Sequence, residues 1–114
     1  MRVYECPSEG PTLRTERDAV DLIAEASGAE WIAIPVARLG EGFFHLRTGA
    51  AGAILQKFLT YHRCVAIVGD IAAHVEASTA LRDFVYECNH GEHVWFVGTM
   101  DELRERLNRA GLLG

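Results

Sequence analysis

The stretch Glu41–Asp70, EGFFHLRTGAAGAILQKFLTYHRCVAIVGD, predicts a glycine-bearing loop, an amphipathic helix and an apolar strand. After the loop, apolar residues recur at i, i+3, i+4, i+7 and i+8, a spacing typical of a helix buried along one side. The next run, Cys64–Gly69, is apolar throughout and too short for an ordinary helix, so it predicts a strand covered on both faces. The helix positions are Ala51, Ile54, Leu55, Phe58 and Leu59.

Helix and strand patterns alternate on both sides of this centre. Thr15 and Thr99 each precede acidic residues and predict helix N-caps, with Glu102 completing a capping box for the second. The segment Met1–Leu13 predicts an N-terminal edge hairpin, because Pro and Gly mark a turn between two short pieces. The other predicted elements are helices from Thr15 to Gly28, from Ser78 to about Asn89 and from Thr99 to Gly111, and strands at Trp31–Val36 and Val94–Val97.

This alternation predicts the fold class α/β, with a mostly parallel central sheet and right-handed crossover helices. The chain has 114 residues, close to the commonest domain size, so we expect a single domain over residues 1–114. A dinucleotide fold would need more strands, and no G-x-G-x-x-G follows a predicted strand. We therefore expect a small α/β sandwich.

Composition and charge narrow the function classes. The net charge is −5, with 11 basic and 16 acidic residues and no basic cluster, which argues against nucleic acid or an anionic membrane as the main partner. No apolar run approaches the ~20 residues that cross a bilayer. The three cysteines, Cys6, Cys64 and Cys88, are scattered and no signal peptide precedes them, so we expect reduced thiols in a cytoplasmic protein.

Nearly the whole chain resembles a bacterial domain-of-unknown-function family, numbered forty-one-eighty. The resemblance rests on FFHLRTGAAGAILQKFLTY and CVAIVGD, and then on LRDFVYECNHG and VWFV. Family members tend to carry a glutamate and two serines where this sequence has Ala53, Ala72 and Cys88. The resemblance implies no established activity.

The element order is also similar to the STAS domains of the anti-sigma-factor antagonist type, which implies a STAS-like architecture. Their signature loop, Asp-Ser-Ser-Gly, opens a long helix. Here the loop would be Leu46-Arg47-Thr48-Gly49, so Thr48 matches the phosphorylatable serine by its hydroxyl and Gly49 matches the glycine. Leu46 replaces the aspartate.

The first candidate site is the segment Arg47, Thr48 and Gly49 at the predicted start of the central helix. Unpaired helix amides there could hold an anion, or a phosphate on the Thr48 hydroxyl next to Arg47. The alternative interpretation is that Thr48 is simply an N-cap.

The second candidate is Asp70 with His74, just past the strand Cys64–Gly69. Small-ligand sites gather at the carboxyl ends of strands in open α/β sheets. The alternative is that Asp70 only turns or caps the chain. Because no triad, nucleophile elbow or phosphate loop is present, the sequence favours a non-catalytic role, and we assign no catalytic residue and no cofactor.

Cys88, His90 and His93 are residue types that zinc prefers, and they form a weaker metal candidate. The spacing Cys-x-His-x-x-His is not that of a familiar finger, and no fourth ligand lies nearby. In the alternative interpretation Cys88 continues the apolar side of its helix. We predict no metal site.

The sequence favours a small regulatory or protein-interaction domain that acts through the loop and helix at residues 47–60. The alternative is a small-molecule or anion-binding protein, or a weak enzyme, with a pocket near Thr48 and Asp70 at the strand ends. A closed pocket holding both residues would favour the ligand, whereas an exposed helix face would favour a protein partner. Short edge strands and an apolar helix side are compatible with a homodimer as well as with a monomer.

Overall fold

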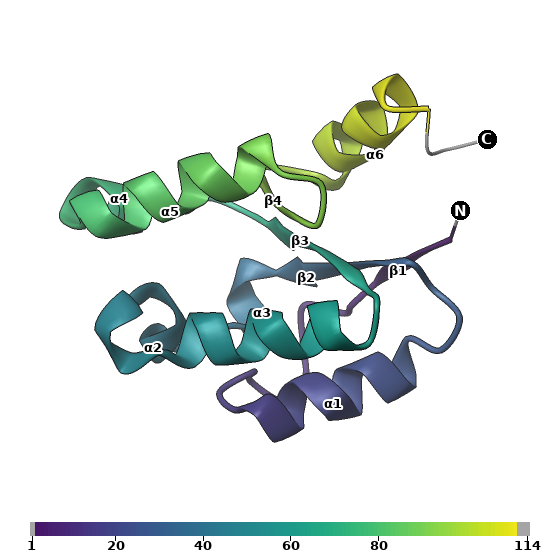
Figure 1. The fold of residues 1–114 in the computed structure, drawn as a ribbon, viewed down its shortest axis with the longest axis horizontal. Helices are drawn as coiled ribbons and strands as arrows, with labels where there is room; N and C mark the ends of the chain where they lie inside the picture. Colours follow the sequence, from purple (N-terminus) through teal and green to yellow (C-terminus); the bar gives the residue numbers. More distant parts are fainter. Residues whose placement is uncertain (1, 112–114) are drawn as a thin grey trace.

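A four-stranded sheet organises the computed structural model, which describes residues 2–111 (Figure 1). The strands lie in the order in which they occur in the chain, and every neighbouring pair is parallel. Parallel strands need crossover connections, which the helices supply. The strands are β1 (Val3–Glu5), β2 (Trp31–Pro35), β3 (Cys64–Val68) and β4 (Val94–Val97).

The helices alternate with the strands as the sequence predicts, and two of them begin at the predicted caps. Thr15 accepts a hydrogen bond from the backbone N–H of Asp18, and Thr99 accepts one from that of Glu102. The α-helices are α1 (Glu16–Glu25), α2 (Glu41–Phe44), α3 (Ala50–Thr60), α4 (Ala72–Ala77), α5 (Thr79–His90) and α6 (Met100–Arg109), with 3-10 turns η1 (Val36–Arg38) and η2 (Leu46–Thr48).

The two faces of the sheet are covered differently. Because right-handed crossovers join strands that are neighbours in sequence order, α1, α3 and α5 all pack on one face. The opposite face packs against α6, whose Leu103 and Leu107 are fully buried. The sheet residues under α6 are Trp31, Ala33, Ala66, Trp95 and Val97.

Helix α6 is held across its face of the sheet by aromatic and charged contacts. The rings of Trp31 and Trp95 lie 4.4 Å apart, and the Arg106 guanidinium lies 3.9 Å above the Trp95 ring. Arg104 reaches Glu5 on β1 at 3.6 Å, so α6 spans from β4 back to the first strand. Cation–π stacking on a tryptophan accounts for an arginine on the inner side of this helix.

The free edge of β4 is closed by Asn89, the last residue but one of α5. The Asn89 side-chain oxygen accepts a hydrogen bond of 2.7 Å from the backbone N–H of Phe96, and its carbonyl accepts one from Arg106. An unpaired strand edge is a template for unwanted pairing, and this side chain blocks it. Asn89 lies in the ECNHG segment quoted above, where it has a structural role.

The α/β class and the parallel sheet are confirmed, but the predicted N-terminal hairpin is wrong. β1 pairs in parallel with β2, and Leu13 forms an isolated parallel bridge with Leu39. The segment between them is instead a loop, because Arg38 donates hydrogen bonds to its Pro7 and Pro11 carbonyls. Met1 lies outside the described residues.

Candidate functional site

The loop before α3 is tied down by the hydroxyl of Thr48. This hydroxyl accepts a hydrogen bond from the backbone N–H of Ala50 (3.2 Å) and lies 2.9 Å from the carbonyl oxygens of Gly42 and His45, which share its hydrogen. The interpretation of Thr48 as the N-cap is wrong by one residue. Gly49 occupies that position with φ of 75°, a left-handed conformation that favours glycine.

This arrangement defines what a phosphate on Thr48 would do. A phosphorylated hydroxyl has no hydrogen to donate, so the contacts with Gly42 and His45 would be lost. Modification would therefore remove the side-chain bonds between the end of α2 and the start of α3, while the backbone bonds from His45 to Gly42 and from Thr48 to His45 remain. Phosphorylation of Thr48 stays a prediction.

Replacing Thr48 by valine is expected to lower the free energy of unfolding by about 1–2 kcal/mol, because three backbone groups lose their hydroxyl partner. Serine at the same position keeps the hydroxyl and should retain most of that stability. Urea unfolding followed by circular dichroism measures both variants. If Thr48→Val unfolds at the same urea concentration as the wild type, the hydroxyl does not hold this loop.

Asp70 and His74 serve separate local contacts. Asp70 accepts a hydrogen bond of 2.9 Å from the backbone N–H of Ala72 and so opens α4. The His74 ring stacks on Phe44, with 4.0 Å between the ring centres, and joins α4 to α2. Four clefts of about 280 to 410 Å³ among residues 2–111 are lined by neither Thr48 nor Asp70, so none of these four holds the two candidates together.

Arg47, by contrast, lines a cleft of about 400 Å³ between η2 and the junction of α4 and α5. Its side chain is exposed and forms no ion pair within the described residues. Across the cleft lies Ser78, whose hydroxyl caps α5 by accepting a hydrogen bond from the Leu81 N–H at 3.1 Å. Arg47 is thus available to a partner from outside.

The predicted metal candidates are not brought together. Cys88 is half-buried on the apolar side of α5, and the His90 ring is held by the Tyr86 carbonyl of its own helix at 2.8 Å. His93 lines a different cleft, with Cys64. Within residues 2–111, no three His, Cys, Asp or Glu side chains are placed to share a metal ion.

A feature that the sequence did not reveal is the incomplete cover of α5. The apolar side of α1 is buried. On the apolar side of α5, Leu81 is buried but the other hydrophobic residues are half-buried. The cause is packing, because α1 lies along α3 while α5 packs against β4 and α4. We give the name apolar strip to the half-buried hydrophobic residues of α5, of η2 and around α4 that pack against the same core: Leu46, Ile71, Val75, Phe84, Val85 and Cys88.

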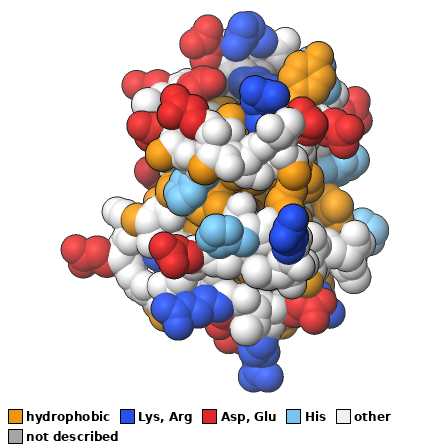
Figure 2. Space-filling view, turned by 90° about the vertical axis from the view of Figure 1, so that its left-hand side faces the viewer, with side chains coloured by type: hydrophobic (Ala, Val, Ile, Leu, Met, Phe, Trp, Pro, Cys, Tyr) orange, Lys and Arg blue, Asp and Glu red, His pale blue; other side chains and the backbone are white. Residues whose placement is uncertain are grey.

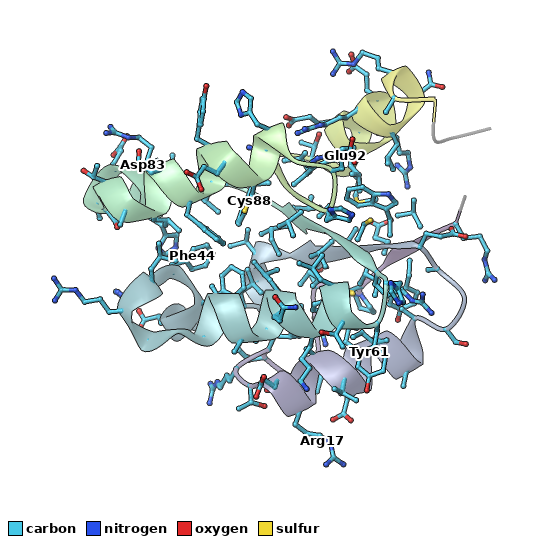
Figure 3. The ribbon with its side chains drawn as sticks, in the orientation of Figure 1. Arg17, Phe44, Tyr61, Asp83, Cys88 and Glu92 are labelled. Atoms are coloured by element: carbon cyan, nitrogen blue, oxygen red, sulfur yellow. The ribbon has the colours of Figure 1, made fainter. Side chains whose placement is uncertain are left out.

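The α5 residues of the apolar strip lie on the side of that helix that faces the α2–α3 segment (Figure 3). Figure 3 shows Phe44 reaching up from α2 and Cys88 on the facing side of α5. In the space-filling view, hydrophobic side chains gather in the hollow between the upper and lower halves of this face (Figure 2). The predicted site at residues 47–60 therefore borders an apolar surface.

The Cys6 thiol is the most deeply buried of the three, with 2% of the residue exposed. Burial raises its pKa to about 12, although the nearby Arg38 charge acts in the opposite direction. The pKa values of Cys64 and Cys88 are also raised by burial. None of these thiols has the lowered pKa of a reactive cysteine.

Stability is expected to fall as the pH rises above about 9, because the unfolded Cys6 thiol ionises near its ordinary pKa of about 8.5 while the folded one stays protonated. Cys6→Ala removes this group and should make the decline shallower by up to about 1.4 kcal/mol per pH unit. Urea unfolding curves of both proteins, recorded at intervals of about one pH unit from about pH 8 to about pH 11, measure this difference in stability. If stability falls equally steeply with pH in the wild type and in Cys6→Ala, the raised pKa of Cys6 is contradicted.

Comparisons with known proteins identify a family and little else. The sequence model described as Domain of unknown function (DUF4180) matches residues 1–107. No curated protein and no solved structure matches the chain. The STAS-like architecture therefore stays a prediction. In the described part of the chain, the structure contains no helix with the length and apolar character needed to span a membrane.

Proposed function

The chain belongs to the family described as Domain of unknown function (DUF4180), and we propose that it is a small regulatory domain that binds another protein through residues 47–60 and the apolar strip. The observation that carries this proposal is the half-buried apolar strip beside an exposed Arg47. Contiguous apolar surface bordered by polar residues is typical of protein–protein contact sites.

The charge at the border suggests the chemistry of the partner. Arg47 is exposed and forms no ion pair with another residue in the range 2–111. A partner segment with apolar side chains next to a carboxylate would match both the apolar strip and this cation. Such complementarity sets the specificity and the rate of encounter more than the final affinity.

None of the four clefts among residues 2–111 contains Thr48 or Asp70, which favours a protein partner over a small ligand at this place. The Thr48 hydroxyl gives the surface a means of regulation. Phosphorylation would remove the bonds of the hydroxyl to Gly42 and His45 and would add negative charge at the border of the binding surface.

The test compares proteins retained from extracts of the native cell by tagged wild type, Arg47→Glu and Arg109→Glu. Arg109 is an exposed cation on α6, across the sheet, and its reversal matches the change in charge. We expect a retained protein whose recovery falls by about tenfold with Arg47→Glu and is unchanged with Arg109→Glu. The retained protein, once purified, should show the same difference in direct binding.

A second variant, Val85→Ser, removes apolar surface from the strip without adding charge and should weaken the same interaction. The proposal is wrong if no protein depends on Arg47, or if both charge reversals weaken retention equally. Circular dichroism of each variant confirms that the fold is intact.

A further inference from the structure

Arg38 is a buried cation without a carboxylate partner. It follows the carboxyl end of β2, is 6% exposed, and has no Asp or Glu oxygen within ion-pair distance in the described part of the chain. Its Nε donates to the Pro11 carbonyl (2.8 Å) and its Nη1 to the Pro7 carbonyl (3.0 Å). A buried charge is costly unless it is paired, so a site that holds only dipoles around it is incomplete.

The loop after β1 is shaped around this guanidinium. A Cβ on Gly10 would lie 3.0 Å from Arg38 Cζ, and the φ of 146° at Gly10 also favours glycine. The third nitrogen, Nη2, forms no hydrogen bond with residues 2–111 and is not among the enclosed atoms that lack a partner. It is therefore accessible from the cleft of about 280 Å³ that Arg38 lines.

The opposite wall of this cleft carries the other sign of charge. Asp18, Asp21 and Glu25 of α1 and Glu9 of the loop all line it. The backbone N–H groups of Arg14 and Thr15 donate to Asp18 and hold its pKa below the usual value, so this carboxylate stays ionised. The four carboxylates would repel a simple anion, and the Arg38 guanidinium would repel a simple cation.

We propose that the cleft between the loop Pro7–Leu13 and helix α1 binds a small zwitterion of the amino-acid type, with its carboxylate on Arg38 and its ammonium group between Asp21 and Glu25. Glu25 forms no ion pair within residues 2–111, and Asp21 has one exposed partner, Arg17. The guanidinium fork matches a carboxylate, and the cleft volume suits a ligand of amino-acid size. This site is separate from the surface proposed for protein binding.

The probes are the proteinogenic amino acids, added singly at millimolar concentration to the full chain and followed by backbone amide NMR. At least one should shift the amides of Gly10 and Thr12 in a saturable way. The N-acetyl and the methyl ester derivatives of that amino acid should bind about tenfold more weakly, because each lacks one charge.

Variants distinguish this site from weak surface binding. Glu25→Gln keeps the shape of an exposed side chain and should weaken binding by about tenfold, whereas the matched change Glu105→Gln on α6 should have no effect. Arg38→Lys keeps the charge, loses the fork and should also weaken binding. The proposal fails if no amino acid shifts these amides, if acetate or the N-acetyl form binds as well as the zwitterion, or if Glu25→Gln binds like the wild type.

Discussion

Leu103→Ala is expected to lower the free energy of unfolding by about 3 kcal/mol. Leu103 is fully buried on α6, the helix that covers its face of the sheet, and packs in one cluster with Trp31 and Ala66. The small Ala66 side chain cannot move to fill the space, so the cavity remains and adds to the lost transfer free energy. Thermal and urea unfolding measure the loss.

The matched control is Glu105→Ala, an exposed position on the same helix, which should change the stability by less than about 0.5 kcal/mol. If both variants lose the same amount, the loss reflects the helix itself and not its packing on the sheet. If neither changes, α6 does not cover this face in solution.

Replacing Asn89 by leucine is expected to cost about 2 kcal/mol, because the Phe96 N–H loses its acceptor in a partly buried place. The change also opens the free edge of β4, so we expect a greater tendency to aggregate. Urea unfolding gives the stability, and light scattering of the folded protein reports the aggregation.

Asn89→Asp should lose no more than about half of the free energy that Asn89→Leu loses, because it keeps an acceptor oxygen for the Phe96 N–H. The account of the strand edge is contradicted if Leu and Asp at this position behave alike. It is also contradicted if both remain as stable as the wild type.

The sheet and its main helices were predictable because their physical causes are local. Apolar runs with no polar interruption gave β2, β3 and β4 to within one residue at each end, with β4 matched at both ends. Hydroxyl caps gave the starts of α1 and α6. These signals depend on neighbouring residues and not on what packs across the fold.

The N-terminus was mispredicted because its structure depends on a distant residue. The loop after β1 is fixed by Arg38, which lies beyond the next strand, and a single arginine there carries no pattern. Helix α4 was missed for a related reason, since its six residues are too few to show a helical period. Asp70 starts this helix through a hydrogen bond that only the structure reveals.

The candidate site was predictable in part. The sequence pointed to the loop Arg47–Gly49, and the structure adds that Thr48 is bonded within it and that Arg47 is exposed and forms no ion pair among residues 2–111. The apolar strip could not be foreseen, because periodicity tells which side of α5 is apolar but not how closely α3 approaches it. The distance between α3 and α5 depends on how the whole sheet packs.

The central claim is that the α2–α3 side of the molecule contacts another protein, and photo-crosslinking in the native cell tests it most directly. A photoreactive phenylalanine analogue is placed at His45, which is exposed beside the apolar strip, or at Asn108, which is exposed on α6. We predict a discrete crosslinked species of higher mass from position 45 and none from position 108. No adduct from position 45, or the same adducts from both positions, would contradict the account.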